Sequence, residues 1–291
     1  MKYTPSNKFA LSVAALLCLS LCLLTVEARA ESIVEMIIAE ADSALWETSP
    51  DYVWDGGPKL YARTQRSSSA KHEFSIVRFS LASLAGMDAE AIQGITLNLT
   101  SMKNDGTKPV EFYGLYEADS LVDGLPWDET TMSSRKCPGY FLDTSLPNVE
   151  YAAGGTTMQI LDMVAPDDPG DDSTAIATPL GSWSPNLVSN TTATFSSDAL
   201  TAFLTAAIAN GDESVSIVLH GGPQSTAALV SFFSKDALVT EIAGNGYAVG
   251  ASIPESFKPY LEVTSAAVPE PSSMILLAVM AVAFGVFWRR K

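Results

Sequence analysis

Ile95-Thr96-Leu97-Asn98-Leu99-Thr100 alternates apolar and polar side chains without interruption, and this stretch decides the fold class. A period of two places its isoleucine and both leucines on one face of an extended strand. A second short run places Phe74 and Ile76 on one face and Val77 and Phe79 on the other. Short runs of this kind between turn signals predict β-strands.

Further strand-like runs recur along the middle of the chain. They occupy residues 110–116, 215–219, 228–233 and 260–264. In the first of these runs we expect Glu111 and Gly114 to face away from most of the apolar side chains. Gly-Gly, Asn-Asp-Gly, Pro-Gly and Gly-Asn-Gly sequences lie between the runs and mark turns. Strands with one apolar and one polar face predict an all-β fold, an antiparallel β-sandwich or jelly roll packed on one side of each sheet.

Two segments depart from the strand pattern. Residues 88–92 predict a single helical turn. Residues 197–209 carry apolar side chains at helical spacing, with Ser197 or Asp198 as the N-cap and Asn210-Gly211 as the stop. We therefore expect one short amphipathic helix packed across the end of the sandwich.

The first 30 residues have the order of a secretory signal peptide. Lys2 and Lys8 supply positive charge, an apolar run follows over residues 9–26, and Ala28 and Ala30 place small side chains where a signal peptidase reads them. A first transmembrane helix that is never removed is the alternative. The small-residue site favours cleavage, so we expect export and removal of residues 1–30.

The C-terminus has the features of an anchor. Pro269-Glu270-Pro271 precedes an uncharged apolar run over residues 274–288, and the chain ends in Arg289-Arg290-Lys291. The run is short for a helix crossing a bilayer core of roughly 30 Å, and bilayer thinning or snorkelling of the basic tail makes up part of the gap. Three terminal positive charges favour a cytoplasmic tail. The sequence thus predicts a C-terminal transmembrane anchor helix that leaves the middle of the chain outside the inner membrane.

This C-terminal order resembles the PEP-CTERM sorting signal. The resemblance implies a Gram-negative-type cell envelope and recognition by an exosortase-type processing enzyme, with cleavage near Pro269-Glu270-Pro271. It also implies a setting of exopolysaccharide, biofilm or floc. The predicted organisation is then a signal peptide over residues 1–30, a β-sandwich domain over 31–265 and a sorting anchor over 266–291.

The composition argues against a nucleic acid partner and against an intramolecular disulfide. The chain has 17 basic and 33 acidic residues, a formal net charge of −16, and the residues between the two termini are more acidic still. Such a surface repels phosphates, so we expect no nucleic acid partner. Cys18 and Cys22 leave with the signal peptide, so Cys137 remains alone and cannot form an intramolecular disulfide. Its two alternatives are a reactive nucleophile and a small apolar side chain packed before a turn.

Several pieces in order resemble the DNRLRE-type family of secreted jelly-roll modules, which are also treated as carbohydrate-binding modules. The matching pieces are Asp42, Gly56-Gly57, Val77 to Leu84, Ile95 to Thr100, Trp127-Asp128-Glu129-Thr130-Thr131, Cys137-Pro138-Gly139, Ser197 to Leu204, Phe233-Ser234-Lys235-Asp236 and Pro259-Tyr260-Leu261. Ser80 stands where the family usually has Asp. The resemblance implies a jelly roll that contacts carbohydrate.

No arrangement of residues predicts catalysis. G-x-S-x-G, H-E-x-x-H and C-x-x-C are all absent from the sequence. The densest acidic cluster could hold Ca²⁺, although a solvated surface loop is the simpler interpretation. Its members are Asp167, Asp168, Asp171 and Asp172. Arg78 and Lys235, on predicted strands, are each expected to pair with a carboxylate.

Aromatic side chains near the mature N-terminus are the candidates for glycan contact, because aromatic faces stack on pyranose rings. They are Trp46, Tyr52, Trp54 and Tyr61, and core packing is the alternative for Trp46 and Trp54. For Trp127 and Trp183 we expect core packing.

These features together predict a non-enzymatic envelope or matrix protein, exported and transiently anchored in the inner membrane, that contacts exopolysaccharide. A glycan-active lyase or hydrolase and a purely structural surface protein remain the alternatives.

Overall fold

The structure is a computed structural model of the whole chain. It describes residues 32–46, 52–53, 57–64, 73–103, 106–122, 125–138, 141–143, 157–159, 177–221, 228–238 and 252–266. The chain divides into two compact units, Val34–Thr264 and a second made of Met1–Ile33 with Ser265–Lys291. Nearly all described residues belong to the first unit.

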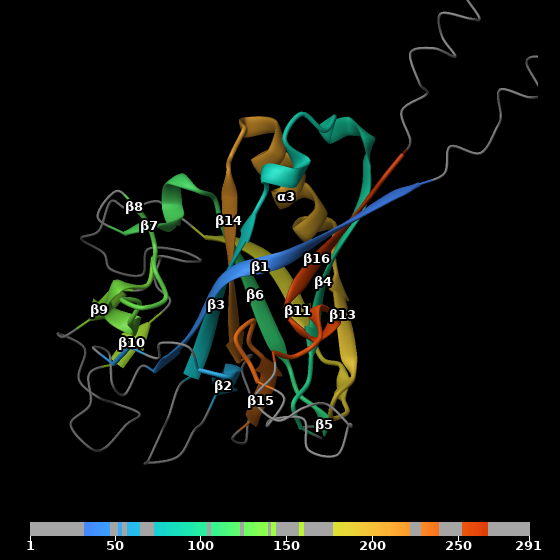
Figure 1. Cartoon of the computed structure of the whole chain (residues 1–291). Coiled ribbons are helices and arrows are strands. Elements are labelled where there is room, and N and C mark those ends of the chain that lie inside the picture. Colours follow the sequence, from blue (N-terminus) through green and yellow to red (C-terminus); the bar gives the residue numbers. More distant parts are fainter. Residues whose placement is uncertain are drawn as a thin grey trace, which may run out of the picture. The chain divides into compact units, whose positions relative to one another are not determined.

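A mostly antiparallel 10-stranded sheet forms the body of this unit (Figure 1). Its strand order is β11-β6-β14-β3-β1-β16-β4-β13, with β2 paired to both β3 and β15. The strands are β1 (Ile33–Trp46), β2 (Lys59–Thr64), β3 (Glu73–Ser80), β4 (Ile92–Thr100), β6 (Val110–Leu115), β11 (Thr178–Trp183), β13 (Thr192–Ser196), β14 (Ser214–Gly221), β15 (Ala228–Phe233) and β16 (Tyr260–Ser265).

Shorter elements decorate this sheet. Three two-stranded pairs are β5 (Gly106–Thr107) with β12 (Asn186–Leu187), β7 (Leu121–Val122) with β8 (Leu125–Pro126), and β9 (Phe141–Asp143) with β10 (Thr157–Gln159). The 3₁₀ turns are η1 (Ala82–Leu84), η2 (Ala89–Ala91), η3 (Ala118–Ser120), η4 (Ser134–Lys136) and η6 (Glu255–Phe257). The described residues contain one α-helix, α3 (Asp198–Asn210).

The sheet closes almost completely on itself. From β3 it continues through β2 to β15, and Ser101, just past β4, forms a bridge with Phe232 of β15. The chain of pairs then returns from β4 through β16 to β1 and β3. The result is a sandwich-like, nearly closed sheet that encloses one apolar core, and few edges of the central strands are left open.

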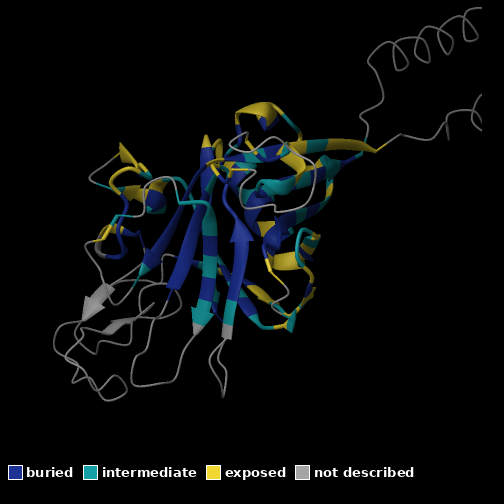
Figure 2. Ribbon diagram, turned by 60° about the horizontal axis from the view of Figure 1, so that its bottom comes forward, coloured by how far each residue is buried: buried dark blue, intermediate teal, exposed yellow. Residues whose placement is uncertain are grey.

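The central strands are buried on both faces, as Figure 2 shows by their dark blue colour. On β3, Val77 and Phe79 belong to the enclosed core, while Phe74 and Ile76 belong to a second core on the opposite face. Val122, Trp127, Met132 and Cys137, which follow β6 in the chain, pack onto this second core. The predicted facing of β3 is confirmed, but the expectation of one polar face per strand is wrong for β3 and β14, because this added layer covers their outer side.

The other predicted strands also lie where the pattern placed them. The isoleucine and two leucines of the 95–100 stretch all face the enclosed core. Gly114 is a correction: it is buried on the inner face of β6 beside the ring of Phe203, instead of facing away. Trp127 is buried in the second core and Trp183 packs against the enclosed core, so the expectation of core packing is confirmed for both.

Helix α3 lies where its caps predict. The hydroxyl of Ser197 accepts the N–H of Leu200 at 2.9 Å and donates to the carbonyl of Leu180 at 2.6 Å, which ties the start of the helix to β11. Gly211 ends the helix with φ 79°, a left-handed conformation that glycine adopts without strain. The predicted turn at 88–92 is present as η2, with Asp88 as its N-cap.

None of the helices in the described part of the chain combines the length and the apolar character needed to cross a bilayer. The predicted signal peptide and the anchor run over residues 274–288 lie outside the described residues and stay predictions.

Helix α3 depends on the absence of a side chain at Gly114. A Cβ built there would lie 2.7 Å from the ring of Phe203. That ring packs against the ring of Tyr116, with 4.6 Å between the two ring centroids. We expect Gly114→Ala to lower the free energy of unfolding by about 1–3 kcal/mol, measured by urea unfolding. Gly94→Ala on β4 is the control, because its Cβ would meet nothing within 4 Å. Equal effects of the two substitutions would contradict this account.

Candidate functional site

Four side chains from three distant segments meet beside β1. Asp42 lies on β1, Glu129 in the segment that follows β8, and Lys235 and Asp236 in the turn that follows β15. We call them the edge cluster. Asp42 and Lys235 are 193 residues apart in the sequence, so only the fold brings them together.

The edge cluster is held by direct hydrogen bonds. The backbone N–H of Asp42 donates to Glu129 at 3.2 Å, and the carboxylate of Asp42 accepts the backbone N–H of Lys235 at 2.6 Å. The Lys235 ammonium donates to Glu129 at 2.9 Å and to Asp236 at 2.6 Å. These bonds fasten two loops to β1, and Glu129 satisfies a backbone N–H of that strand.

Burial controls the ionisation of the cluster. Loss of solvent raises the pKa of Asp42 to about 7, against the lowering effect of the Lys235 N–H bond. Burial alone would lower the pKa of Lys235, but its bonds to Asp236 and Glu129 outweigh burial and raise it. Lys235 therefore stays charged at neutral pH and serves as the counter-charge of the cluster.

Metal ligation is the other chemistry this arrangement suggests. Carboxylate oxygens of Asp42, Glu129 and Asp236 lie within 4.8 Å of one another, close enough for one cation. The ammonium of Lys235 already bonds two of these three carboxylates. The chain thus supplies its own cation, and the edge cluster is an ionic link between loops.

Next to the edge cluster, Arg78 of β3 contacts Trp127. The Arg78 guanidinium donates to Glu40 at 2.5 Å and to the carbonyl of Trp127, and lies 5.0 Å from the centre of the Trp127 ring. The indole N–H donates to the buried Ser216 hydroxyl at 2.9 Å. The predicted carboxylate pairing is confirmed for both Arg78 and Lys235, although Lys235 lies in a turn and not on a strand.

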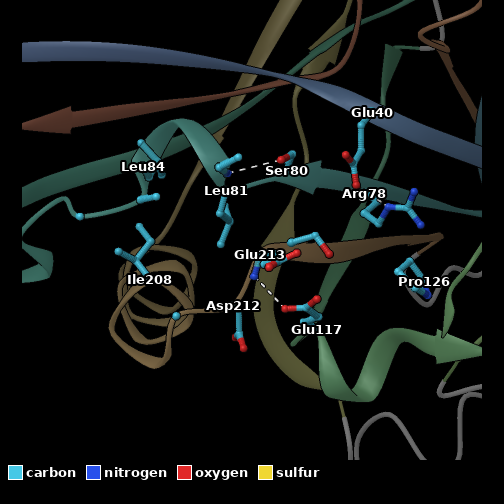
Figure 3. A pocket seen from close by; sticks show the side chains of 15 residues that line it. Glu40, Arg78, Ser80, Leu81, Leu84, Glu117, Pro126, Ile208, Asp212 and Glu213 are labelled. Carbon is cyan, nitrogen blue, oxygen red and sulfur yellow. Dashed lines mark hydrogen bonds and ion pairs between the residues drawn. The ribbon is translucent and has the colours of Figure 1, made fainter. Parts of the chain in front are cut away.

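A cleft of about 750 Å³ opens beside Arg78 (Figure 3). We call it the acid-lined cleft, and its lining includes Glu40, Arg78, Leu84, Glu117, Ile208 and Asp212. Glu40 faces it because the β1–β3 register shifts between Ala39 and Ala41, and a bulge of this kind redirects a side chain. The cleft has the size of small-molecule sites.

Acidic groups that line the cleft, together with the nearby Asp119, influence one another. Burial, followed by the charges of Glu117 and Asp119, raises the pKa of Asp212. Burial also raises the pKa of Asp119. Glu117 accepts the backbone N–H of Glu213 at 2.7 Å, which fixes its carboxylate at the rim. These carboxylates are crowded and electrostatically costly when all are ionised.

Comparison with known protein families finds a match at the C-terminal end of the chain. Residues 267–291 match the PEP-CTERM protein-sorting motif. This PEP-CTERM motif indicates an exported protein that exosortase sorts to the cell envelope, and it begins two residues after β16 ends at Ser265. None of the curated proteins compared with the chain matches it.

The structure describes part of the aromatic set proposed for glycan contact. The rings of Trp46 and Tyr52 stack, with centroids 5.5 Å apart and an angle of 21° between planes, and Tyr52 is 50% exposed. Tyr61 lies on β2, half-buried, and Trp54 lies outside the described residues. Two of the four are thus brought together, and glycan contact stays a prediction.

The remaining predicted positions lie outside the described residues. They are Ala28, Ala30, Asp167, Asp168, Asp171, Asp172, Pro269, Glu270, Pro271, Arg289, Arg290 and Lys291. Cys137 is described: it is buried in the second core, and burial raises the pKa of its thiol well above the usual value. A thiol in this state is a poor nucleophile, which favours the packing alternative.

Sequence reasoning did not identify the edge cluster or the acid-lined cleft as sites. A signal for the edge cluster was present, because Asp42, residues 127–131 and residues 233–236 are three of the pieces that carry the DNRLRE resemblance. One piece of the resemblance, Val77 to Leu84, also contributes to the lining of the cleft, but the acids of the cleft carry no such signal. Glu40, Glu117 and Asp212 are ordinary acids in an acidic chain, and only the fold places them on one cavity.

The raised pKa of Asp42 predicts how stability depends on pH. A carboxyl that binds its proton more tightly when folded stabilises the fold below about pH 4, and this contribution is lost as the pH rises through about 7. We expect a loss on the order of 4 kcal/mol between pH 4 and 8, measured by urea unfolding, and a flatter profile for Asp42→Asn.

The slope that remains in Asp42→Asn belongs to other groups, including Asp119 and Asp212, whose pKa values are also raised. Asp198→Asn, at the exposed start of α3, is the control and should keep the profile of the unmodified chain. A profile for Asp42→Asn as steep as that of the control would contradict the assignment.

Proposed function

We propose that this chain is an exported, exosortase-processed protein whose β-domain works outside the inner membrane as a non-enzymatic module that contacts exopolysaccharide. The observation that carries the proposal is the PEP-CTERM motif at residues 267–291. It follows β16 almost directly, so the β-domain is displayed on a signal made for export and sorting.

The stacked pair of Trp46 and Tyr52 supports glycan contact. Tyr52 is half exposed while its ring rests on Trp46, so one aromatic side chain orients the other. An oriented and solvent-accessible ring offers a flat apolar face to the C–H groups of a pyranose, at little cost in side-chain entropy. Contacts of this kind are weak singly and strengthen when many copies act at one surface.

A binding role is favoured over catalysis by the state of the reactive groups. The buried carboxylate of Asp42 is hydrogen-bonded into an ionic link between loops. The Cys137 thiol is buried, with a pKa well above its usual value. Neither group is arranged as a nucleophile or a general base facing a cavity.

Loss of the Tyr52 ring tests glycan contact. We expect Tyr52→Ala in the exported, processed protein to weaken adsorption to the host's own exopolysaccharide about tenfold, measured by sedimentation with insoluble polysaccharide. Tyr52→Phe keeps the ring and should bind like the unmodified chain. Adsorption unchanged in Tyr52→Ala would contradict this contact, and release of reducing ends or unsaturated products would identify an enzyme instead.

Processing is tested at the motif itself. Replacing Pro269 and Pro271 with alanine should leave the chain uncut and membrane-associated in a host that contains exosortase, since alanine removes the backbone restriction by which proline favours an extended segment. Mass spectrometry of the mature C-terminus measures the outcome. Replacing Pro254 with alanine, in the β-domain, is the control and should be processed normally. Normal cleavage of the double variant would rule out recognition through these prolines.

A further inference from the structure

Exposed apolar side chains gather at the start of β1. Ile33, Val34 and Met36 are 52%, 54% and 49% exposed, and all three stand among the first four residues of the strand. We call these three side chains the apolar strip. Apolar side chains exposed one at a time are ordinary on a protein surface, whereas a group of them in one place marks a contact surface.

The backbone beside the apolar strip has an open edge. The described strands that pair with β1 are β3 and β16. The pairing with β3 begins at Ala39, opposite Phe79, and β3 ends at Ser80. Residues 33–37 therefore extend past β3, and on that side no described strand pairs with them. Such an edge offers backbone N–H and C=O groups to an extended segment of a partner.

The apolar strip lies where the chain leaves the domain toward the sorting motif. On the other side of β1 lies β16, and the N–H of Ala39 donates to the carbonyl of Pro259 at 2.9 Å. The start of β1 and the end of β16 lie at the same corner of the sheet, so the two strands run in opposite directions (Figure 1). Counting equally along both strands from this bond sets Ile33 opposite Ser265, and neighbouring strands are about 5 Å apart.

An enzyme that cleaves near the Pro-Glu-Pro sequence must come close to this corner. Pro269 follows Ser265 by four residues, and an extended chain spans at most about 3.6 Å per residue, so Pro269 lies within about 14 Å of the end of β16. A specific protein contact covers about 800 Å² on each partner, which is more than a short peptide supplies. The folded strand ends are the nearest further surface.

Charge favours a protein other than a second copy as the partner. Glu35 lies within residues 33–37, and a carboxylate there is repelled by the phosphates of a lipid surface. If two copies paired antiparallel about the middle of this stretch, Glu35 would stand opposite the same residue of the other copy, and like charges directly opposite destabilise a sheet. The net charge of −16 adds to both repulsions. A different chain avoids these costs.

We infer that the start of β1 is a second recognition surface for exosortase, which covers the apolar strip and the open edge of residues 33–37 while it acts near Pro269. This inference rests on the proposed function, because it assumes that the sorting motif is processed. It adds a surface of the folded domain to what the enzyme recognises. The strip and the motif come from opposite ends of the sequence, so exosortase reads them together only after β1 and β16 have paired.

Substitution of the apolar strip tests the inference. Replacing its three residues with threonine removes the apolar contact and keeps a side chain that favours strands. We expect the mature C-terminus to appear about tenfold more slowly in a host that contains exosortase, measured by pulse-chase labelling and mass spectrometry. The control carries threonine at three exposed apolar positions in other elements and should be processed at the unmodified rate. These positions are Leu125, Val188 and Leu238.

Two measurements separate this effect from export and folding. The apolar strip lies close to the predicted signal peptidase site at Ala30, so N-terminal sequencing restricts the comparison to chains that begin at Glu31. Urea unfolding of the exported proteins verifies that the strip variant and the control variant fold equally well.

The outcomes separate this inference from the proposed function. Normal processing of the strip variant, or equal slowing in the control variant, overturns the inference. If the Pro269 and Pro271 replacement blocks cleavage and the strip variant is cut normally, exosortase processing stands and the second surface falls. If neither change affects cleavage, both fall. Two further results overturn the inference in favour of another partner: strip-dependent flotation of the exported protein with phospholipid vesicles, and a strip-dependent dimer in size-exclusion chromatography.

Discussion

The burial of β3 on both faces is the constraint on which the rest of the structure depends. A strand in a closed sheet normally has one face in the core and one in water, and its outer residues are then free to be polar. In this domain Phe74 and Ile76 occupy the outer face, at 0% exposure for both. They must be covered, and Trp127, Met132 and Cys137 pack against them.

Covering the outer face creates the polar sites. A loop laid over a sheet brings backbone groups and strand edges out of water, and each needs a partner. Arg78 holds the Trp127 carbonyl, Ser216 holds the indole N–H, and Glu129 takes the N–H of Asp42. Arg78 and Glu129, which form ion pairs in this region, are thus also partners for backbone groups that the covering residues take out of water.

Sequence patterns predicted the strands and their faces but not the neighbours of each strand. The faces of β3 and β4 were assigned correctly, because side-chain direction in a strand depends only on local spacing. Gly114 was misplaced because a glycine gives no polarity signal, and its packing depends on a distant helix. The sites depend on contacts between residues that are far apart in the sequence. Asp42 and Lys235, for example, are 193 residues apart, and no periodic pattern in the sequence connects them. The DNRLRE resemblance came nearest to identifying the edge cluster, because it includes the segments that carry its four side chains. The hydrogen bonds among these side chains explain their presence as supports of the fold.

Charge links the domain to its sorting signal. Copies of a chain with a net charge of −16 repel one another when they are gathered at one surface, so direct contact between copies is unfavourable. A polymer that carries positive charge at intervals would instead be attracted to every copy. The net charge of a domain sorted to the envelope thus opposes contact between its own copies and favours contact with neutral or cationic material.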